Sequence, residues 1–531
     1  FSQYARTFLR KSNEYAISIL YHKCTIFISF YYILDILGLD TIWSTMESRR
    51  TKRNKKNKKK SVLTLLNWGL FVVYSVSAVF LAYSIYQYQI FNFRNLNHFL
   101  VGAMAVLGVV GVFLLLRKKA KKWTTVLLII GIALSGFGIW GVQSLVQLGS
   151  TVNKNASYSS YDMEIIVPAD STISDVSQVT SLLAPVDNDG DNITKLLDSL
   201  QSEKNVTLTP TPTASYMDAY QAMLAGQGDA MVLNSVFLEM LRAEDPEVDS
   251  KIKVLYSMTN EIKNESSSTN QETGNAINIY ISGIDTFGSI SSVSRSDVNI
   301  IMTINRDTKK ILLTTTPRDA YVTIPGAGQN QKDKLTHAGI YGVDTSVQTL
   351  EQLYGIDIHY YARLNFTSFL KLIDVVGGVD VENDQAFSSG GYDFATGTIH
   401  LNAEQALIFV RERYSLANGD NDRGKNQEKV IVSLINKLTQ PENLLHYQEI
   451  MQSLSDSIQT DMQLETMMEL VNQQLETGGN FTVTSQAVSG TGSTGVLPSY
   501  AMPGYALYMM ELNPDSLEQA KAAINATLAG Q

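Results

Sequence analysis

Three long, uncharged apolar stretches dominate the first third of the chain. Residues 62–86, 99–116 and 123–148 contain no Asp, Glu, Lys or Arg. At about 1.5 Å of rise per helical residue, each stretch approaches or exceeds the length needed to cross a hydrocarbon core about 30 Å thick. A buried helical bundle in a soluble protein is the alternative, but uncharged runs of this length favour a membrane anchor. The pattern therefore predicts three transmembrane helices within residues 62–148.

The loops between these stretches predict how the anchor is oriented. Nine of the twelve residues 49–60 and five of the six residues 117–122 are Lys or Arg, whereas residues 87–98 contain only Arg94. Basic loops stay in the cytoplasm, so the first helix runs outward, the second returns and the third leaves again. The sequence predicts a multi-pass protein of the cell membrane with a cytoplasmic N-terminus, a basic cytoplasmic segment at 46–61 and an extracellular region at 150–531.

The first 45 residues fit this scheme poorly. Their one apolar run, 25–39, is short and is interrupted by Asp35, while Met46 stands just before the basic run 49–60. A run of this length is too weak for a further span. We therefore treat residues 1–45 as a doubtful N-terminal extension.

Alternating strand and helix patterns beyond the membrane predict α/β extracellular domains. In the accessory α/β domain expected at 161–263, strands are predicted at 163–168 and 229–233 and helices at 193–201, 216–224 and 236–242. The polar segment 264–275 is expected to be a linker.

A denser pattern follows at 276–440, which we take as the catalytic domain. Strands are predicted at 277–281, 298–305 and 311–315, and helices at 345–354, 366–376, 403–409 and 426–438, with Asn402 as a helix cap. Residues 306–309 form the turn of a hairpin. The tail, 441–531, is expected to be a C-terminal helical extension around a Gly/Ser/Thr-rich segment.

Charge and composition narrow the chemistry. The net charge is +15 for residues 1–149 and −24 for residues 150–531. Because nucleic-acid binding needs accumulated Lys and Arg, the larger part is not expected to bind nucleic acid. The only cysteine, Cys24, excludes a disulfide within the rest of the chain and any cysteine-based zinc site.

Arginines in the acidic part are few and grouped. Seven of the eight arginines in 150–531 fall between positions 295 and 423. Most stand beside carboxylates: Arg295 near Asp297, Arg318 by Asp319, Arg411 and Arg413 around Glu412, and Arg423 after Asp420 and Asp422. Guanidinium groups suit bidentate phosphate binding, and the carboxylates suit a hard divalent cation. Surface salt bridges explain the same spacing equally well.

Spacing adds partial support for a phosphate site. Arg411 and Arg413 share a face only where the chain is extended, whereas Arg423 and Gln427 project together on one helix. Arg306 and Arg363 match no such pattern and are expected in turn or surface positions. Residues 187–191, an Asp-rich run, lack the Gly of a calcium loop and are expected to form a turn.

Five ordered segments carry a resemblance to a known family. They are Ile281-Ser-Gly-Ile-Asp285, Ser294-Arg-Ser-Asp-Val298, Pro317-Arg-Asp319, Phe409-Val-Arg-Glu-Arg413 and Asp422-Arg-Gly-Lys-Asn-Gln427. Together they resemble the signature segments of the LytR-CpsA-Psr family, above all the CpsA-type proteins of streptococcal capsule and exopolysaccharide loci. The resemblance implies a catalytic α-β-α sandwich with a mixed sheet and an apolar pocket for a prenyl chain.

The resemblance also implies site residues and a cofactor. Asp285 and Asp297 would hold Mg²⁺ or Mn²⁺, and Asp297, Arg295, Arg318 and Arg423 would be catalytic. The residues that would contact a diphosphate are Arg295, Arg318, Arg411, Arg413, Arg423, Gln427 and Asp420. Whether Asp297 or another carboxylate is the catalytic base stays open.

The implied function is a Mg²⁺-dependent phosphotransferase of the peptidoglycan ligase type. It would move a capsular or exopolysaccharide glycopolymer from a polyprenyl-diphosphate carrier to a peptidoglycan acceptor, with membrane lipids and other polysaccharide machinery as further partners. Two alternatives remain on sequence grounds. One is a non-enzymatic regulator that senses the lipid diphosphate, and the other is a lipid-diphosphate hydrolase.

Overall fold

The computed structural model describes residues 52–117, 121–264, 274–284, 290–417, 419–440, 450 and 458–531, without the side chains of 52–61 and 420–421. Several sequence predictions lie outside these residues. They concern the extension 1–45, the side chains of the basic segment 46–61, the linker centre, Asp285 and the side chain of Asp420.

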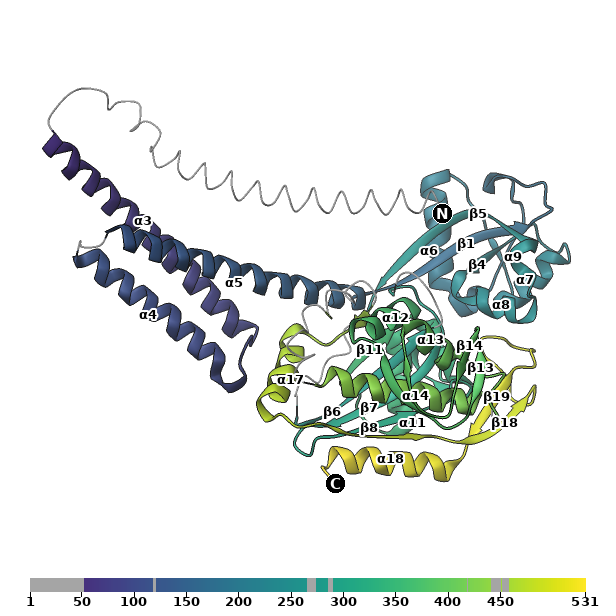
Figure 1. The fold of residues 1–531 in the computed structure, drawn as a ribbon. Coiled ribbons are helices and arrows are strands. Elements are labelled where there is room, and N and C mark those ends of the chain that lie inside the picture. The colour runs from purple at the N-terminus through teal and green to yellow at the C-terminus, as the bar shows by residue number, and fades with distance from the viewer. Residues whose placement is uncertain are drawn as a thin grey trace. The chain divides into compact units, whose positions relative to one another are not determined.

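Three long helices follow one another near the N-terminal end of the described chain, drawn from purple to blue in Figure 1. They are α3 (Lys52–Gln87), α4 (Leu96–Arg117) and α5 (Lys121–Ala156). Each is long and apolar enough to cross a membrane over Val62–Gln87, Phe93–Arg117 and Lys121–Ala156. The predicted three membrane-capable helices are therefore confirmed by length and composition. The chain divides into two compact units, 1–75 with 107–132 and 76–106 with 133–531.

A five-stranded sheet forms the accessory α/β domain in the second unit. Its strands are β1 (Tyr158–Pro168), β2 (Leu182–Ala184), β3 (Pro210–Pro212), β4 (Ala230–Asn234) and β5 (Ile252–Lys263), in the order β3-β2-β4-β1-β5. Its helices are α6 (Val186–Lys204), α7 (Tyr216–Leu224), α8 (Leu238–Glu244) and α9 (Val248–Lys251). The acidic run 187–191 lies inside α6, where Asp189 accepts hydrogen bonds from Tyr216 and Asn234. The expected turn is present in part, because α6 is kinked within this run, at Asp189 (φ −140°, ψ 35°).

A six-stranded mixed sheet forms the core of the following domain. Its strands are β6 (Ala276–Ile284), β7 (Ser296–Asn305), β8 (Lys310–Thr315), β11 (Tyr360–Leu364), β16 (Ile458–Thr460) and β17 (Thr482–Ala487), in the order β16-β11-β6-β7-β8-β17. The pairs β11·β6 and β17·β8 are parallel, and the remaining neighbours are antiparallel. The predicted hairpin of β7 and β8 is present.

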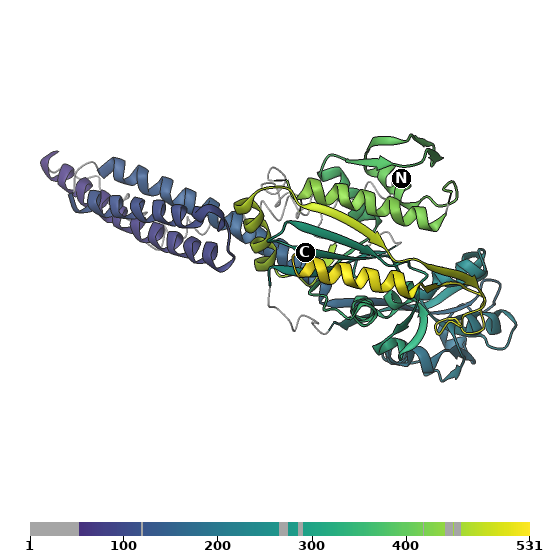
Figure 2. The same cartoon turned by 90° about the horizontal axis from the view of Figure 1, so that it is seen from below.

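Helices cover both faces of this sheet. On one face, α14 (Asp420–Leu438) and α17 (Leu464–Thr477) pack on residues such as Ile279, Ile300 and Leu313. On the other, α11 (Val343–Tyr354) and α18 (Pro514–Leu528) pack on Tyr280 and Ile301. Because successive residues of a strand point to opposite faces, each apolar strand supplies both cores. Figure 2 shows the sheet between α14 and α18, so an α-β-α arrangement is present.

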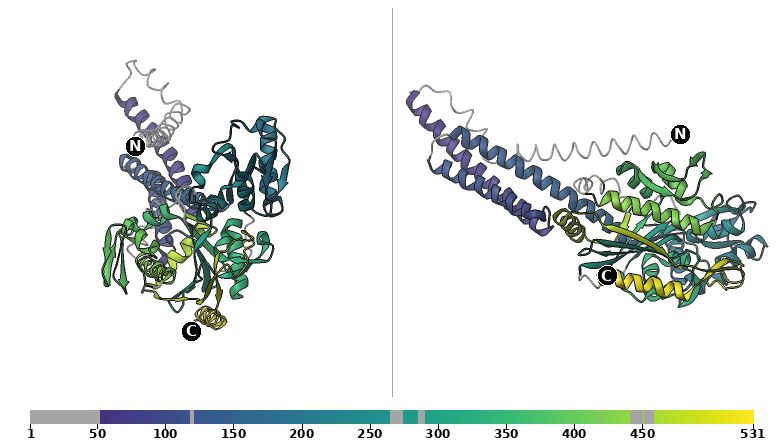
Figure 3. Two further views of the ribbon diagram at one scale, coloured as in Figure 1. Left: turned by 90° about the vertical axis from the view of Figure 1, so that its right-hand side faces the viewer. Right: turned by 60° about the horizontal axis from the view of Figure 1, so that its bottom comes forward.

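The C-terminal segment is part of this domain. Two of the helices expected around the Gly/Ser/Thr-rich segment are present as α17 and α18, but the described residues of 441–531 are not a separate helical extension, because β16 and β17 form the two edges of the six-stranded sheet. In Figure 3, β17 runs beside β8 beneath α14. Short strands are hard to recognise in a polar sequence such as 482–487, where alternation of apolar residues is weak.

Smaller elements surround the end of the sheet. They are β9 (Tyr321–Ile324), β10 (Gln331–Lys334), α10 (Leu335–Ala338), α12 (Phe366–Val375), β12 (Val379–Asn383), β13 (Phe387–Ser389), β14 (Tyr392–Phe394), β15 (Gly397–Leu401), α13 (Ala403–Arg411), β18 (Gly490–Thr494) and β19 (Tyr508–Leu512). The predicted cap of α13 is present: Asn402 accepts a hydrogen bond from the Gln405 backbone at 2.9 Å, and the Gln405 side chain accepts one from the Asn402 backbone.

Removing this cap is expected to weaken the domain measurably. Asn402→Ala leaves the Gln405 amide without its acceptor and lowers the free energy of unfolding by about 1 kcal/mol. For a domain of this size, the melting temperature falls by about 2–4 °C. Thermal unfolding of the detergent-solubilised protein measures the change. Asn402→Asp keeps an acceptor oxygen and serves as the control, and equal melting temperatures for both variants would contradict the assignment.

Candidate functional site

The strand register brings the predicted site segments to one edge of the six-stranded sheet. β6 ends at Ile284, which pairs with Ser296 at the start of β7. β8 ends at Thr315, which pairs with Ile300 of β7. The segment with Arg295 and Asp297 therefore lies beside the segment that leaves β8 toward Arg318.

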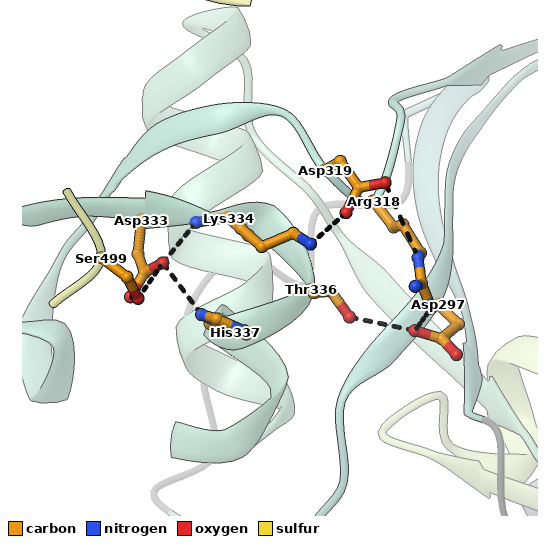
Figure 4. A network of polar contacts seen from close by, with 8 residues as sticks. All are labelled: Asp297, Arg318, Asp319, Asp333, Lys334, Thr336, His337 and Ser499. Carbon is orange, nitrogen blue, oxygen red and sulfur yellow. Dashed lines mark hydrogen bonds and ion pairs between the residues drawn. The ribbon is translucent and has the colours of Figure 1, made fainter. Parts of the chain in front are cut away.

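Asp297 is the centre of this edge. Its Oδ1 accepts a hydrogen bond from Arg318 Nη1 at 2.9 Å and one from Thr336 Oγ1 at 3.0 Å. The side chains of Asp297 and Arg318 are only 13% and 18% exposed. Figure 4 shows both donors meeting the same carboxylate oxygen. Among the described residues none donates to Oδ2, so that oxygen is left for another partner.

Three arginines from different segments act on this carboxylate. Burial alone would raise the pKa of Asp297, but the positive charges of Arg318, Arg295 and Arg423 and the Thr336 hydroxyl hold it below its ordinary value. A charged carboxylate in a partly dehydrated place is stable only with such compensation. The structure thus brings together four predicted site residues that span more than a hundred positions of sequence.

Arg411 and Arg413 are held by aromatic rings. The Arg411 guanidinium lies 4.4 Å from the centre of the Phe366 ring, and that of Arg413 lies 4.6 Å from the Tyr414 ring. Arg411 is the last residue of α13, whereas Arg413 follows the helix. The chain is extended at Glu412 between them (φ −66°, ψ 136°), as their spacing requires for a shared face, and each guanidinium also lies against its own ring.

α14 supplies the remaining predicted residues. Arg423 and Gln427 both lie on this helix, one turn apart, as the spacing predicts. Gln427 Nε2 donates to the Val410 carbonyl at 3.2 Å, which ties α14 to the turn that carries Arg411. Asp422 is buried and accepts hydrogen bonds from Lys425 and Gln385 at 3.0 Å each.

The carboxylate oxygen at this edge fits a magnesium ion that is bound together with a phosphate ligand. Among the described residues, no three His, Cys, Asp or Glu side chains form a group that could hold a metal alone. Mg²⁺ commonly uses only one or two protein carboxylates, with phosphate and water oxygens completing its shell. Asp297 Oδ2 is such an oxygen. The predicted second carboxylate, Asp285, lies outside the described residues.

Two arginines occupy places that the sequence interpretation did not anticipate. Arg306 belongs to the β7–β8 turn but is buried, and it contacts the Gly274 carbonyl and Glu469. Arg363 lies in β11, 4% exposed, and donates to the Ile290 carbonyl at 3.1 Å and to Gln459 at 3.2 Å. Burial lowers the pKa of Arg363 to about 10. Arg306 thus lies in the expected turn, although its side chain is buried. The expectation of a turn or surface position is wrong for Arg363, because its donors satisfy the buried Ile290 carbonyl and Gln459.

Sequence reasoning missed Thr336 and Lys334. Thr336 donates to Asp297, and Lys334 forms an ion pair of 2.5 Å with Asp319 beside Arg318. Thr336 carries no charge, and the run Lys332-Asp-Lys334 contains no arginine and matches none of the family segments. Their position after β10 becomes meaningful only when β10 and α10 are placed against the sheet edge.

A polar cavity of about 610 Å³ runs along α14. It is lined by Asp380, Val381, Glu382, Lys425, Glu428, Lys429, Val432, Ser433, Asn436, Lys437, Gln440, Val483 and Ser485. A smaller cavity of about 200 Å³ continues it toward Asp422. The mixed charges suit a hydrated ligand, whereas the apolar pocket implied for a prenyl chain stays a prediction.

Known proteins similar to this chain include one family and several named transferases. A sequence model of the LytR_cpsA_psr family matches residues 248–522. The chain is 34% identical over 270 residues to the polyisoprenyl-teichoic acid–peptidoglycan teichoic acid transferase TagU of Oceanobacillus iheyensis, covering 50% of this chain and 78% of that protein. It is 36% identical over 211 residues to TagU of Enterococcus faecalis, covering 39% and 69%.

Solved structures give weaker matches. The crystal structure of Bacillus subtilis TagV is 24% identical, with a TM-score of 0.41, and covers 48% of this chain and 98% of that one. A second model, DNA polymerase processivity factor, matches residues 118–233. That match begins before α5 and stops inside β4, so it follows no folded unit of this chain.

The same substitution, Arg to Met, is expected to lower the free energy of unfolding much more at Arg363 than at Arg295. Arg363→Met leaves the Ile290 carbonyl and Gln459 without donors in a buried place and lowers the free energy of unfolding by about 2–4 kcal/mol. Arg295→Met, at the partly exposed site, changes it by less than about 1 kcal/mol. Chemical denaturation of both variants provides the comparison. Equal losses would show that Arg363 is no more structural than a site arginine.

Proposed function

This chain belongs to the LytR-CpsA-Psr family, and from that premise we propose that it transfers a glycopolymer from a polyprenyl-diphosphate carrier to peptidoglycan. The observation that carries the proposal is that Arg295, Arg318 and Arg423 all act on the carboxylate of Asp297, whose side chain is only 13% exposed. Guanidinium groups gathered in this way suit the binding of a diphosphate. The relatives named teichoic acid transferases support the same reaction class.

The anchor would place the enzyme where its lipid donor is. We take α3, α4 and α5 as membrane spans, with the basic segments on the cytoplasmic side and residues 150–531 outside the cell. Donor and enzyme then share one membrane face, which raises their effective concentration without tight binding in solution.

The guanidinium groups would bind the diphosphate and spread its charge. Arg295, Arg318 and Arg423 would contact it at the sheet edge, and Arg411 and Arg413 would approach from the end of α13. An acceptor hydroxyl oxygen then forms a bond to the phosphorus next to the glycan, and the bond from that phosphorus to the bridging oxygen breaks. Polyprenyl phosphate leaves with the bridging oxygen, and the hydroxyl proton passes to a base or to water.

Asp297 suits cation binding better than proton removal. A carboxylate whose pKa is lowered is a weak base, and its Oδ2, to which no described residue donates, is a hard oxygen ligand. A bound Mg²⁺, held by Asp297 and by Asp285, would screen the phosphate charge during attack. The protein's own part is to keep Asp297 ionised and correctly oriented, which Arg318 and Thr336 do through Oδ1.

The polymer is expected to be a capsular or exopolysaccharide chain. The accessory domain between the membrane helices and the sheet is the feature that the CpsA-type resemblance implies. The TagU relatives are named as teichoic acid transferases. Offering purified enzyme both donor classes, each on a polyprenyl diphosphate, measures the preference directly.

A single assay separates transfer from its alternatives. The full chain in nanodiscs receives a lipid-diphosphate-linked glycan, Mg²⁺ and peptidoglycan. Polyprenyl phosphate released together with peptidoglycan-linked glycan supports transfer. Release without linkage indicates a hydrolase, and binding without release indicates a regulator that senses the lipid.

Substitutions at the convergence point are expected to abolish turnover in this assay. Arg423→Ala and Asp297→Asn should each reduce polyprenyl phosphate release at least about 100-fold, because each removes charge stabilisation from the transition state. Arg242→Ala is the matched control, since Arg242 pairs with Glu239 and Asp249 on the accessory domain. Full activity of both site variants would eliminate the proposed site.

Metal removal tests the cofactor. Chelation with EDTA is expected to stop release of polyprenyl phosphate, and added Mg²⁺ or Mn²⁺ should restore it, because both ions prefer oxygen ligands. Turnover unchanged after exhaustive chelation would show that the arginines alone neutralise the diphosphate.

A further inference from the structure

The short helix α10 contacts three segments of the site at once. The Thr336 hydroxyl donates to Asp297, and the Thr336 backbone amide donates to the Arg318 carbonyl at 2.9 Å. Gly339, directly after the helix, packs on the backbone around Arg295 so closely that a Cβ there would lie 2.6 Å from the Ser294 oxygen. The position of α10 therefore sets the positions of Asp297, Arg318 and Arg295 together.

Asp333 fixes α10 from its other side. This carboxylate is 1% exposed and stands two residues before the helix. It accepts hydrogen bonds from His337 Nδ1 at 2.9 Å and from the Lys334 backbone amide at 2.7 Å. Asp333 thereby links the strand β10 to a side chain of α10 itself, as Figure 4 shows.

The remaining donors to Asp333 come from the C-terminal part of the chain. Ser499 Oγ lies 2.9 Å from both carboxylate oxygens, and the Ala501 amide donates at 2.8 Å. Ser499 also accepts from the Met502 amide at 3.1 Å. Ala501 and Met502 are buried in the core of the accessory domain, together with Ile340 just after α10. Residues 499–502 thus join that core to the carboxylate that holds α10.

We propose that Thr336 is a positioning residue for Asp297, and that Asp333 and residues 499–502 hold Thr336 in place. The proposal rests on the transferase function proposed above. It gives the accessory domain a role in the reaction. The core of this domain holds residues 499–502, and these residues hold α10 through Asp333. A second observation agrees with this. The buried Asp333 carboxylate accepts hydrogen bonds from four separate donors, although it contacts no group that takes part in the proposed reaction.

Orientation of Asp297 is what the arrangement controls. Three arginines attract this carboxylate from different directions, and rotation of its side chain would exchange Oδ1 for Oδ2. Two donors on Oδ1, from Arg318 and Thr336, define one orientation and leave Oδ2 for the cation. Catalytic groups must be held within about 0.5 Å of their productive places, which requires such second contacts.

The kinetic test compares two substitutions of one residue. Thr336→Val removes the hydroxyl at nearly constant size and is expected to lower kcat about tenfold or more, the effect of losing one hydrogen bond to a charged group. KM for the lipid donor should stay within about twofold. Thr336→Ser keeps the hydroxyl and should recover most of kcat. Unchanged kcat in Thr336→Val would overturn the assignment while leaving the transferase function intact.

The link to the C-terminal segment is tested without activity. In the full chain, Ser499→Ala is expected to speed hydrogen exchange of peptides that cover residues 333–338. Ser516→Ala is the matched control, because Ser516 likewise accepts a backbone hydrogen bond, from Ser489, away from Asp333. Unchanged exchange at 333–338 in Ser499→Ala would overturn the link even if the enzyme showed no transferase activity.

A double variant joins the two measurements. If Ser499 acts through Thr336, Ser499→Ala combined with Thr336→Val loses less kcat than the product of the single losses. Losses that multiply would show two independent effects and overturn the proposed connection.

Discussion

One buried negative charge among three guanidinium groups is the interaction on which the site depends. Arg295, Arg318 and Arg423 repel one another, and gathering them at a partly dehydrated sheet edge is costly without a counter-charge. Asp297 supplies one such charge, and its pKa stays below the ordinary value although burial opposes ionisation. Asp319 adds a second negative charge, 3.9 Å from Arg318. Guanidinium groups gathered at one edge suit bidentate binding of phosphate oxygens, which a diphosphate provides.

The fold brings this cluster together from distant parts of the chain. Arg295 directly precedes β7, Asp297 is its second residue, Arg318 follows β8, and Arg423 lies on a helix that packs across the same sheet. The sheet in turn is closed at both edges by β16 and β17, strands from beyond residue 457. The C-terminal segment also contributes Ser499 to Asp333. Position of the site residues thus depends on segments that hold no phosphate-binding group themselves.

Sequence patterns predicted the elements with strong periodicity and missed those defined by tertiary contacts. The three apolar helices, the β7–β8 hairpin and the Asn402 cap follow from local rules of hydropathy, turns and capping, and all are present. β16 and β17 are short polar strands. They form because neighbouring strands of the sheet supply the partners for their backbone hydrogen bonds. Arg363 was placed at the surface because charge usually lies there, and its buried acceptors, Ile290 and Gln459, are far away in sequence. Thr336 carries no charge, so no motif could single it out.

The weak basicity of Asp297 explains why so much structure serves its orientation. Displacement at a phosphorus atom places negative charge on its non-bridging and leaving oxygens, so catalysis depends largely on positioning and on charge stabilisation. Correct placement of positive charge around the phosphate oxygens is therefore a main requirement of the site. An ionised Asp297 with Oδ1 occupied by Arg318 and Thr336 is suited to that task and unsuited to proton removal. In such a site the Asp297 carboxylate must be correctly placed. The contacts of α10 with Asp297, Arg318 and the Arg295 backbone keep it in one orientation.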